Sequence, residues 1–162
     1  MPNNFFSREL LWVSLLSTAV VGAFLPGCGG ATPEQEPLPT LTAQPLMYGG
    51  HDYLFIRSAR TWSQAENTCL SLGYGLVTIN DAQEQAWLRS IEGGTPNWWI
   101  GATDSARERY WVWAHGTSTY TNWGPGQPND YNGNEDCAHN NYGSWNDIDC
   151  ETQMYFICES LD

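Results

Sequence analysis

Four cysteines in the C-terminal two thirds of the chain limit its fold more than any other sequence feature. They are Cys69, Cys137, Cys150 and Cys158. An even number of cysteines in an exported domain predicts two disulfides, and four cysteines allow three pairings. A zinc site is the alternative, but the chain has no CxxC or HxxxH spacing that would hold one. We therefore expect a domain braced by two disulfides, in a pairing that the spacing leaves open.

The N-terminal segment indicates export. Residues 10–25 form an uncharged, mostly apolar run, which is short for a membrane span and typical of a secretory signal. The run ends in Leu-Pro-Gly-Cys at Cys28. This resembles a bacterial lipobox, although its proline departs from the usual pattern, and it predicts lipidation of Cys28. The alternatives are an ordinary cleaved signal or an uncleaved anchor, with Cys28 incidental.

These observations predict three segments. We expect a signal peptide over residues 1–27, a Pro-rich tether over 28–45 and a single folded domain over 46–162. The expected location is the cell surface or outer membrane, reached through a lipid anchor at Cys28, with secretion as the alternative.

Charge and aromatic content exclude several classes of protein. The formal net charge is −12, with six Arg and no Lys, so a phosphate backbone is repelled and nucleic acid is not expected as a partner. Nine Trp and eight Tyr are incompatible with a disordered acidic chain. The sequence contains no HExxH, GxSxG or phosphate-binding loop, and its three His are scattered. We predict a binding protein rather than an enzyme.

Two helix-start patterns precede a series of short strands. Capping boxes at Ser63–Glu66 and Asp81–Glu84 predict helices from these points, with Cys69 on the inner face of the first. The buried stripe of the second helix is expected at Trp87, Leu88 and Ile91. Strands are expected at residues 53–56, 76–79, 98–101, 110–113 and 155–158. Helices followed by short strands and long loops predict an α+β domain.

The stretch from Gln127 to Asp147 is rich in oxygen ligands. It reads QPNDYNGNEDCAHNNYGSWND, with four carboxylates and seven Asn or Gln, and no Lys or Arg follows Arg109. Ca²⁺ prefers six to eight such oxygens, and a bound divalent ion relieves the repulsion between crowded carboxylates. An EF-hand is excluded, because the required Gly and Glu positions counted from Asp130 hold Glu135 and Asn141. A solvated acidic loop is the alternative.

An ordered set of residues within 46–162 resembles the pattern of the C-type lectin family. The resemblance rests on Cys69, Trp99-Ile100-Gly101, Gln127-Pro128-Asn129, Glu135-Asp136-Cys137, Trp145-Asn146-Asp147, Cys150 and Phe156-Ile157-Cys158. It implies the α+β fold of that family, with two helices, short antiparallel sheets and a long calcium-binding loop. It also implies the disulfides Cys69–Cys158 and Cys137–Cys150 in the short form of the domain, and a cis peptide bond before Pro128.

The resemblance implies one calcium site and favours a second. The family's primary ligands correspond to Gln127, Asn129, Glu135, Asn146 and Asp147. A second calcium ion is expected at Asp104, Glu108, Asp130 and Asp136, with Glu135 shared. Surface ion pairs of the nearby Arg107 and Arg109 are the alternative for the second set.

The primary site implies sugar binding. In this family Glu-Pro-Asn usually accompanies mannose-type ligands and Gln-Pro-Asp galactose-type ligands, whereas this chain has Gln-Pro-Asn. Tyr131 occupies the position where galactose-binding relatives often stack a Trp on the sugar, so we lean to galactose or N-acetylgalactosamine. A Tyr131 that packs on its own loop is the alternative. The sugar-contacting set is Gln127, Asn129, Tyr131, Glu135, Asn146 and Asp147.

Two other binding functions remain for such a domain. The first is a protein-binding adhesion module of the same fold that binds no sugar. The second is ice binding by the alternating Thr117, Thr119 and Thr121, although one short row is a small surface. The complete set of primary ligands favours a glycan as the partner.

Overall fold

The computed structural model describes residues 44–161. The expected signal peptide, Cys28 and all but the end of the expected tether lie outside the described residues. No helix in the described part of the chain is both long enough and apolar enough to cross a membrane.

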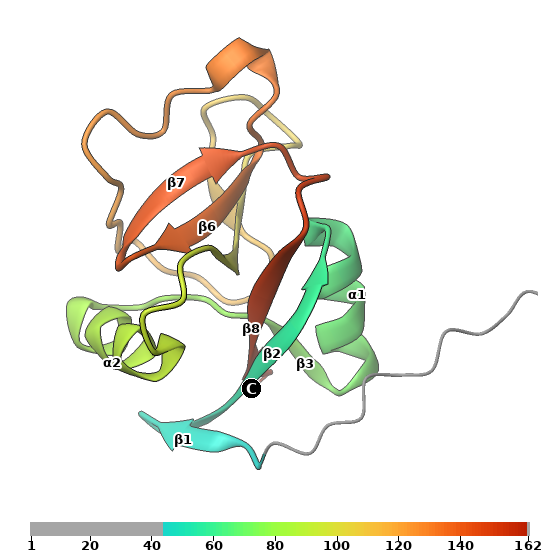
Figure 1. Cartoon of the computed structure of the whole chain (residues 1–162), viewed down its shortest axis with the longest axis vertical. Helices are drawn as coiled ribbons and strands as arrows, with labels where there is room; N and C mark the ends of the chain where they lie inside the picture. Colours follow the sequence, from blue (N-terminus) through green and yellow to red (C-terminus); the bar gives the residue numbers. More distant parts are fainter. Residues whose placement is uncertain (1–43, 162) are drawn as a thin grey trace, which may run out of the picture. The chain divides into compact units, whose positions relative to one another are not determined.

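The described chain alternates short strands with two helices (Figure 1). The elements in order are β1 (Leu46–Tyr48), β2 (His51–Arg60), α1 (Trp62–Ser71), β3 (Tyr74–Leu76), α2 (Ala82–Glu92), β4 (Trp98–Thr103), β5 (Val112–Trp113), the 3-10 turn η1 (Tyr131–Gly133), β6 (Cys137–Asn141), β7 (Ser144–Ile148) and β8 (Met154–Ser160).

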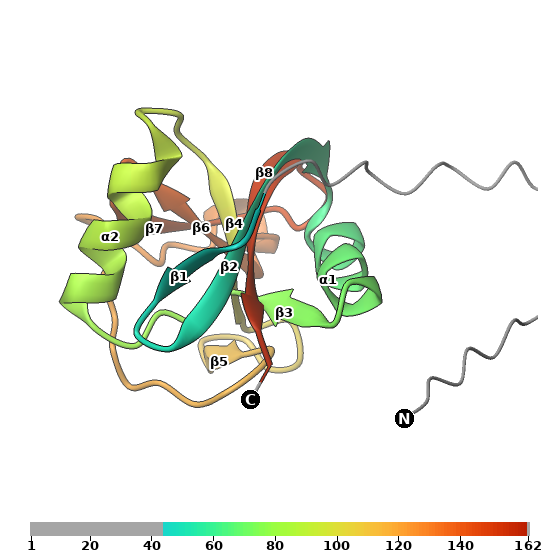
Figure 2. The same ribbon diagram turned by 90° about the horizontal axis from the view of Figure 1, so that it is seen from below.

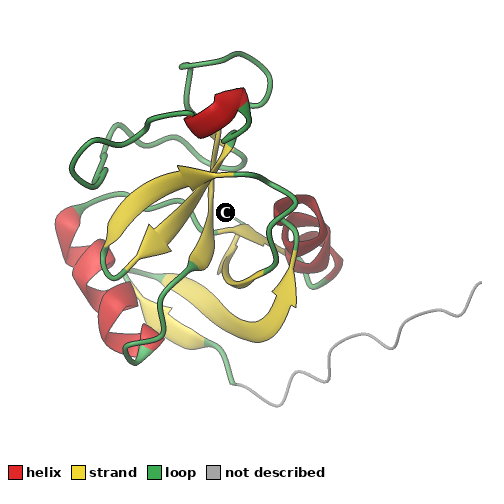
Figure 3. Cartoon of the chain, turned by 45° about the horizontal axis from the view of Figure 1, so that its top comes forward, coloured by secondary structure: helices red, strands yellow, loops and turns green. Residues whose placement is uncertain are grey.

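One sheet contains all of the strands. Its order is β1-β2-β8-β4-β6-β7, and β3 and β5 pair with β8 and β4 at the side of this path. The α+β class and the two helices are as expected. One pairing differs from the expected antiparallel sheets, because β4 and β8 run parallel, with Trp98 opposite Tyr155 and Trp99 opposite Phe156. The sheet is therefore mixed (Figure 3).

Helix α1 begins two residues earlier than its sequence pattern predicts. Its N-cap is Thr61, whose hydroxyl accepts from the backbone N–H of Gln64 at 3.4 Å, while the Gln64 side chain accepts from the Thr61 N–H at 3.3 Å. The capping box is thus Thr61–Gln64 rather than Ser63–Glu66, because Gln serves in the third position as well as Glu. Cys69 lies on the inner face, as predicted, and is fully buried.

Helix α2 begins at the predicted cap but buries a different face. The Asp81 carboxylate accepts from the Glu84 N–H at 2.8 Å, and Gly93 ends the helix in the left-handed conformation. Of the expected apolar stripe only Leu88 is buried; Trp87 and Ile91 are partly exposed. The other buried side chains of α2 are polar, and they are Glu84, Gln85 and Glu92.

Hydrogen bonds attach this polar face of α2 to the sheet, although Glu92 Oε2 accepts none from the described residues and lies 3.7 Å from Arg89 Nη1. The Trp145 indole donates to Gln85 Oε1 at 2.6 Å, and Gln85 Nε2 donates to Asn140 Oδ1 at 3.2 Å. Asn140 Nδ2 in turn donates to Glu92 Oε1 at 2.6 Å. Burial raises the pKa of Glu92 above its usual range. Hydrophobic periodicity does not reveal such a face, because its buried residues are polar and are buried together with hydrogen-bonding partners.

The two helices lie on opposite sides of the strand pair formed by β2 and β8 (Figure 2). The disulfide Cys69–Cys158 joins α1 to β8 across 89 residues, and Cys137–Cys150 joins β6 to the segment after β7 across 13 residues. This is the pairing that the resemblance implies. Trp98, Trp99 and Phe156 are fully buried and fill the core between these elements.

Three strand predictions need adjustment. β3 ends at Leu76, and the buried residues 77–79 continue without regular strand pairing. Of residues 110–113 only Val112–Trp113 forms a strand, and Tyr110 is 61% exposed. Conversely, β6 lies within the stretch Gln127–Asp147, where we predicted no strand. Residues 137–140 are all buried, so they show no alternation of polar and apolar side chains that would reveal a strand.

A long connection between β5 and β6 carries most of the predicted ligands. In Figure 1 the part of this connection that contains η1, coloured orange, forms one end of the domain, while β1 and the C-terminus lie at the other. The Gln127–Pro128 peptide bond within it is cis. The sheet thus presents the loop at one end and leaves the start of β2 and the end of β8 together at the opposite end, which we call the base.

Candidate functional site

A carboxylate of β7 holds the end of the Gln-Pro-Asn triplet. Asp147 is fully buried and accepts from the backbone N–H of Asn129 at 2.9 Å and from that of Asp130 at 2.7 Å. The side chain of Asp147 therefore fixes the path of the loop directly after the cis bond. This contact joins two of the five predicted primary ligands, Asn129 and Asp147, across 18 residues of sequence.

A tight turn brings the next two acids together. Asp130 adopts a left-handed conformation, with φ of 46°, and its Oδ1 accepts from the Glu135 N–H at 3.3 Å. Glu135 Oε2 accepts from the Tyr131 N–H at 2.8 Å. Burial, followed by the negative charges of Asp147 and Asp130, raises the pKa of Glu135. These three carboxylates are close enough to repel one another.

His139 supports the fourth ligand, Asn146, from the neighbouring strand. The two residues are opposite each other in the β6–β7 ladder, and Asn146 Nδ2 lies 3.1 Å from His139 Nε2 and 2.6 Å from the Asp147 carbonyl oxygen. Burial lowers the pKa of His139 to about 4, so its neutral Nε2 can accept a hydrogen bond. Both amide hydrogens of Asn146 are then used inside the protein, which leaves Oδ1 for a ligand.

The support of Asn146 by His139 is not evident from the sequence, because the three His are scattered along it. Only the register of β6 against β7 places His139 beside Asn146. The signal available in the sequence was weak: two polar residues in short segments that flank a tyrosine-glycine turn.

Three of the four acids in the second predicted ligand set form a cluster that does not include Asp130. One oxygen each of Asp104, Glu108 and Asp136 lie within 4.8 Å of one another. Asp104 follows β4 directly, and its N–H donates to the Asp136 carbonyl oxygen at 3.1 Å. Thr103 Oγ1 donates to the same carbonyl at 2.7 Å, and the Arg109 N–H donates to Asp104 Oδ2 at 2.8 Å. Backbone contacts therefore hold the cluster between β4 and β6.

The two sets face one cavity of about 310 Å³. Its lining residues come from both sets and from the segments between them: Asp104, Glu108, Arg109, Trp111, Pro128, Asn129, Asp130 and Asp147. Gln127 shares no hydrogen bond with the other four primary ligands in the described part of the chain; its own N–H donates to the Gly124 carbonyl oxygen.

The donor set fits a hard divalent cation. Gln127 Oε1 and Asp104 Oδ1 are buried and accept no hydrogen bond from any described residue, although each belongs to a predicted ligand. Burial, and then the charges of Asp136 and Asp147, raise the pKa of Asp104. Arg107 lies over the Tyr110 ring, with 5.6 Å from the guanidinium carbon to the ring centroid. The region thus combines carboxylates and amide oxygens with two buried acceptors that lack a donor among the described residues, and Arg109 is the one basic side chain that lines the cavity.

Comparison with known proteins now identifies the family. Residues 58–160 match the family model described as "Lectin C-type domain". The chain belongs to the C-type lectin domain family. It is 34% identical to lactose-binding lectin l-2 of Anguilla japonica, covering 96% of this chain and 95% of that protein. It is 35% identical to ladderlectin of Oncorhynchus mykiss, covering 65% of this chain and 60% of that protein.

Solved structures agree on the fold. The human scavenger receptor C-type lectin carbohydrate-recognition domain superposes with a TM-score of 0.69 at 37% identity, covering 73% of this chain and 96% of that one. The family consists of binding proteins, which confirms the prediction of a non-enzymatic domain. A domain with two disulfides is consistent with an extracellular location. The relatives named above are animal lectins, and they lend no support to a bacterial lipoprotein or to a lipid anchor at Cys28.

Proposed function

We propose that this domain is a calcium-dependent lectin that binds sugar hydroxyls at the end of its long loop. The observation that carries the proposal is the buried side-chain amide oxygen of Gln127, Oε1, which accepts no hydrogen bond within the described chain. Leaving such a group unsatisfied costs about 1–3 kcal/mol unless a ligand contacts it. The proposed ligands are Gln127, Asn129, Glu135, Asn146 and Asp147.

When bound, calcium would offer open coordination positions to two neighbouring sugar hydroxyls. The side chains around the ion would then act as hydrogen-bond donors or acceptors toward these sugar hydroxyls. Glu135 accepts from a hydroxyl, while the amides of Gln127 and Asn129 donate to hydroxyl oxygens. Asp147 is fully buried and already accepts from two backbone N–H groups, so its part would be to hold the ion and the loop. Asn146 contributes its Oδ1 alone, since its amide hydrogens contact His139 and the Asp147 carbonyl oxygen.

We assign a second, structural calcium to the acids around Asp104. Asp104, Glu108 and Asp136 supply the core of this site, and Asp130 and Glu135 lie on the loop that joins it to the first. The buried Oδ1 of Asp104 supports the assignment. An ion at this position would neutralise acids that otherwise repel one another and would hold the loop against β4.

We infer a preference for galactose or N-acetylgalactosamine. One relative is named for lactose binding, lactose-binding lectin l-2, which supports a galactose-containing ligand. Tyr131 is 68% exposed in the loop, which supports a ring that is available to stack on the apolar face of a sugar over one that packs on its own loop. The Gln-Pro-Asn triplet itself is compatible with either class.

Retention on sugar resins tests this function. The full chain is applied to galactose, lactose and mannose resins in calcium and again in EDTA. We expect calcium-dependent retention that is stronger on galactose and lactose than on mannose. Retention that is unchanged by EDTA would contradict the calcium mechanism, and stronger retention on mannose would contradict the preference.

The alternative is an adhesion module that binds protein and no sugar. It predicts no retention on any of the three resins and no displacement by free sugars. A calcium titration separates the two functions further, because the lectin requires calcium at Gln127 and Asp147, whereas protein binding through another face of the domain does not.

The N-terminal segment completes the proposal. We infer a signal peptide over residues 1–27, a tether over 28–45 and the lectin domain over 46–162, in a protein that is exported. Lipidation of Cys28 is a more specific hypothesis than export alone. Mass spectrometry of the mature N-terminus decides it, because a lipidated chain begins at Cys28 with added acyl mass and a simply secreted chain carries none.

A further inference from the structure

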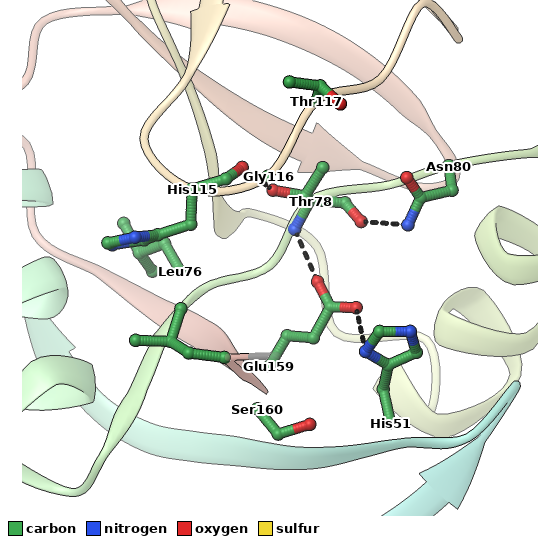
Figure 4. Close-up of a pocket in the computed structure, with 10 residues that line it drawn as sticks. His51, Leu76, Thr78, Asn80, His115, Gly116, Thr117, Glu159 and Ser160 are labelled. Atoms are coloured by element: carbon green, nitrogen blue, oxygen red, sulfur yellow. Dashed lines mark hydrogen bonds and ion pairs between the residues drawn. The ribbon is translucent and has the colours of Figure 1, made fainter.

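The base of the domain contains a second, larger cavity that the proposed lectin site does not use. Its volume is about 630 Å³, and it lies between the start of β2, the segment that follows β3, the loop after β5 and the end of β8 (Figure 4). The lining residues are His51, Leu76, Thr78, Asn80, His115, Gly116, Thr117, Glu159, Ser160 and Leu161. They share no member with the cavity of the long loop.

A buried carboxylate forms the centre of this cavity. Glu159 is 7% exposed, and Figure 4 shows its side chain between Thr78 and His51. Its Oε2 accepts from the Thr78 N–H at 2.9 Å, and its Oε1 lies 3.4 Å from His51 Nδ1. Backbone and neighbouring side chains therefore hold the carboxylate in a fixed orientation.

Two carboxylates, Glu84 and Glu159, lie close to the single hydroxyl proton of Tyr53. The Tyr53 hydroxyl lies 2.8 Å from Glu84 Oε1 and 3.2 Å from Glu159 Oε1. A phenol has one proton, so it can donate fully to only one of these two carboxylates at a time. Burial, followed by the charge of Glu84, accordingly raises the pKa of Glu159. A cation bound in the cavity would relieve this repulsion.

The wall of the cavity is suited to a cation and not to an anion. Neither Lys nor Arg lines it, and its two basic side chains each lie against a carboxylate, His51 against Glu159 and His115 against Glu66. Thr78 and Asn80 add polar groups, while Leu76 and Leu161 provide apolar contact for a short hydrocarbon chain. An ammonium group on such a chain matches both features.

We propose that this cavity binds a primary ammonium group carried on a short organic chain, with Glu159 as its counter-ion. The site includes none of the predicted calcium ligands, although the first residues of the β5–β6 connection, His115 to Thr117, border it. A lysine side chain and an amino sugar both carry this chemistry, and the cavity volume accommodates either.

The test uses the full chain in EDTA, so that sugar binding through calcium does not contribute. Nα-acetyl-lysine amide is titrated while backbone amide resonances are followed by NMR. We expect saturable shifts at residues that line the cavity, such as Thr78 and Gly116. Nα-acetyl-norleucine amide, which lacks only the ammonium group, should bind at least about tenfold more weakly. Equal binding of the two probes, or no saturable shift from either, would overturn the proposal.

Galactosamine forms a second arm that distinguishes the source of the ammonium group. Stronger binding of the lysine amide supports a peptide ligand, and stronger binding of galactosamine supports an amino sugar. The same arm in calcium separates this cavity from the lectin site, because shifts at Thr78 report on the base and shifts at Asn129 report on the loop. Failure of either site is thus visible without the other.

Variants on the exposed wall avoid a folding defect. Thr117 lines the cavity and Thr119, two residues further on, does not; both are exposed. Thr117→Arg supplies a cation within reach of Glu159, so we expect it to abolish binding of the lysine amide, whereas Thr119→Arg leaves binding unchanged. Glu159→Gln removes the charge itself and should weaken binding at least about tenfold. Wild-type affinity in Thr117→Arg would contradict the proposal even if Glu159→Gln failed to fold.

Discussion

At the base of the domain, both oxygens of Glu159 have partners from the protein, in the Thr78 N–H and the Tyr53 hydroxyl. At the opposite end, Gln127 Oε1 in the long loop and Asp104 Oδ1 just after β4 are equally enclosed but accept no hydrogen bond from the described residues. Both ends are rich in carboxylates, so composition does not separate them. The difference lies in whether the fold itself supplies the donors.

This difference separates carboxylates that the fold itself orients from oxygens that only a ligand can satisfy. A buried acid with protein donors contributes to the fold regardless of the solution around it. A buried oxygen without donors stabilises the fold only when something from solution contacts it. The loop end should therefore depend on calcium, and the base should not. Four changes test this distinction between the two ends of the domain.

Removal of the disulfides should have the largest effect, and the two bonds should differ. Cys69–Cys158 closes 89 residues around the base, and Cys137–Cys150 closes 13 residues beside the loop. Chain entropy predicts losses of about 4.6 and about 3 kcal/mol in the free energy of unfolding for the two Cys→Ser pairs. Urea unfolding in EDTA measures both. The distinction fails if the Cys137→Ser, Cys150→Ser protein is the less stable of the two.

Asp147→Asn should have the next largest effect, confined to the loop end. The change removes a ligand charge while keeping an acceptor for the Asn129 and Asp130 N–H groups. We expect calcium affinity to fall about 100-fold or more, which is about 2.7 kcal/mol, with sugar retention lost. Calorimetric titration of calcium measures the change.

Glu151→Gln is the matched control for that variant. Glu151 is exposed and lies just beyond the loop end, so the same loss of one charge should leave calcium affinity within about twofold of wild type. A comparable loss in both variants would show that net charge, rather than coordination by Asp147, controls calcium binding.

Tyr131→Ala should have a smaller effect, limited to the sugar. Loss of one stacking ring from an exposed position is expected to weaken galactose binding about three- to tenfold without changing calcium affinity or stability. Tyr142→Ala is the control, since Tyr142 is 60% exposed, has no predicted ligand role and lies on the β6–β7 turn. Equal losses in the two variants would remove Tyr131 from the sugar site.

The response to pH should be the smallest effect, and it tests the base. The raised pKa of Glu159 means that the folded protein binds more protons than the unfolded chain above the usual glutamate value of 4.5. The contribution of Glu159 to stability is therefore greatest at low pH and is lost as pH rises through its folded pKa. Unfolding free energies in EDTA at pH 5 and pH 7 measure this dependence.

Glu159→Gln supplies the reference for the pH experiment. Glu92, whose pKa burial also raises, is present in both proteins and cancels in their difference. Wild type should therefore lose stability relative to Glu159→Gln between pH 5 and pH 7. A difference that stays constant or grows in favour of wild type would show that the Glu159 carboxylate is fully satisfied.

Much of the fold could be predicted because local rules agree with the global structure. Asp81 caps α2 as its sequence pattern predicts, and Cys69 lies on the buried face of α1. The predictions failed where burial is polar or two-sided. The inner face of α2 uses Glu84, Gln85 and Glu92, and β6 is buried on both sides, so neither shows the expected apolar pattern.

The sequence by itself determined which oxygen-bearing residues the long loop contains and that no Lys or Arg accompanies them. Residue types and their order are enough for that, because a family pattern is read along one chain. Only the tertiary structure decided which of these oxygens lack a protein donor, that His139 holds Asn146, and that Glu84 and Glu159 share the hydroxyl of Tyr53. Each of those facts depends on contacts between segments distant in sequence, which strand register and helix packing set and composition does not.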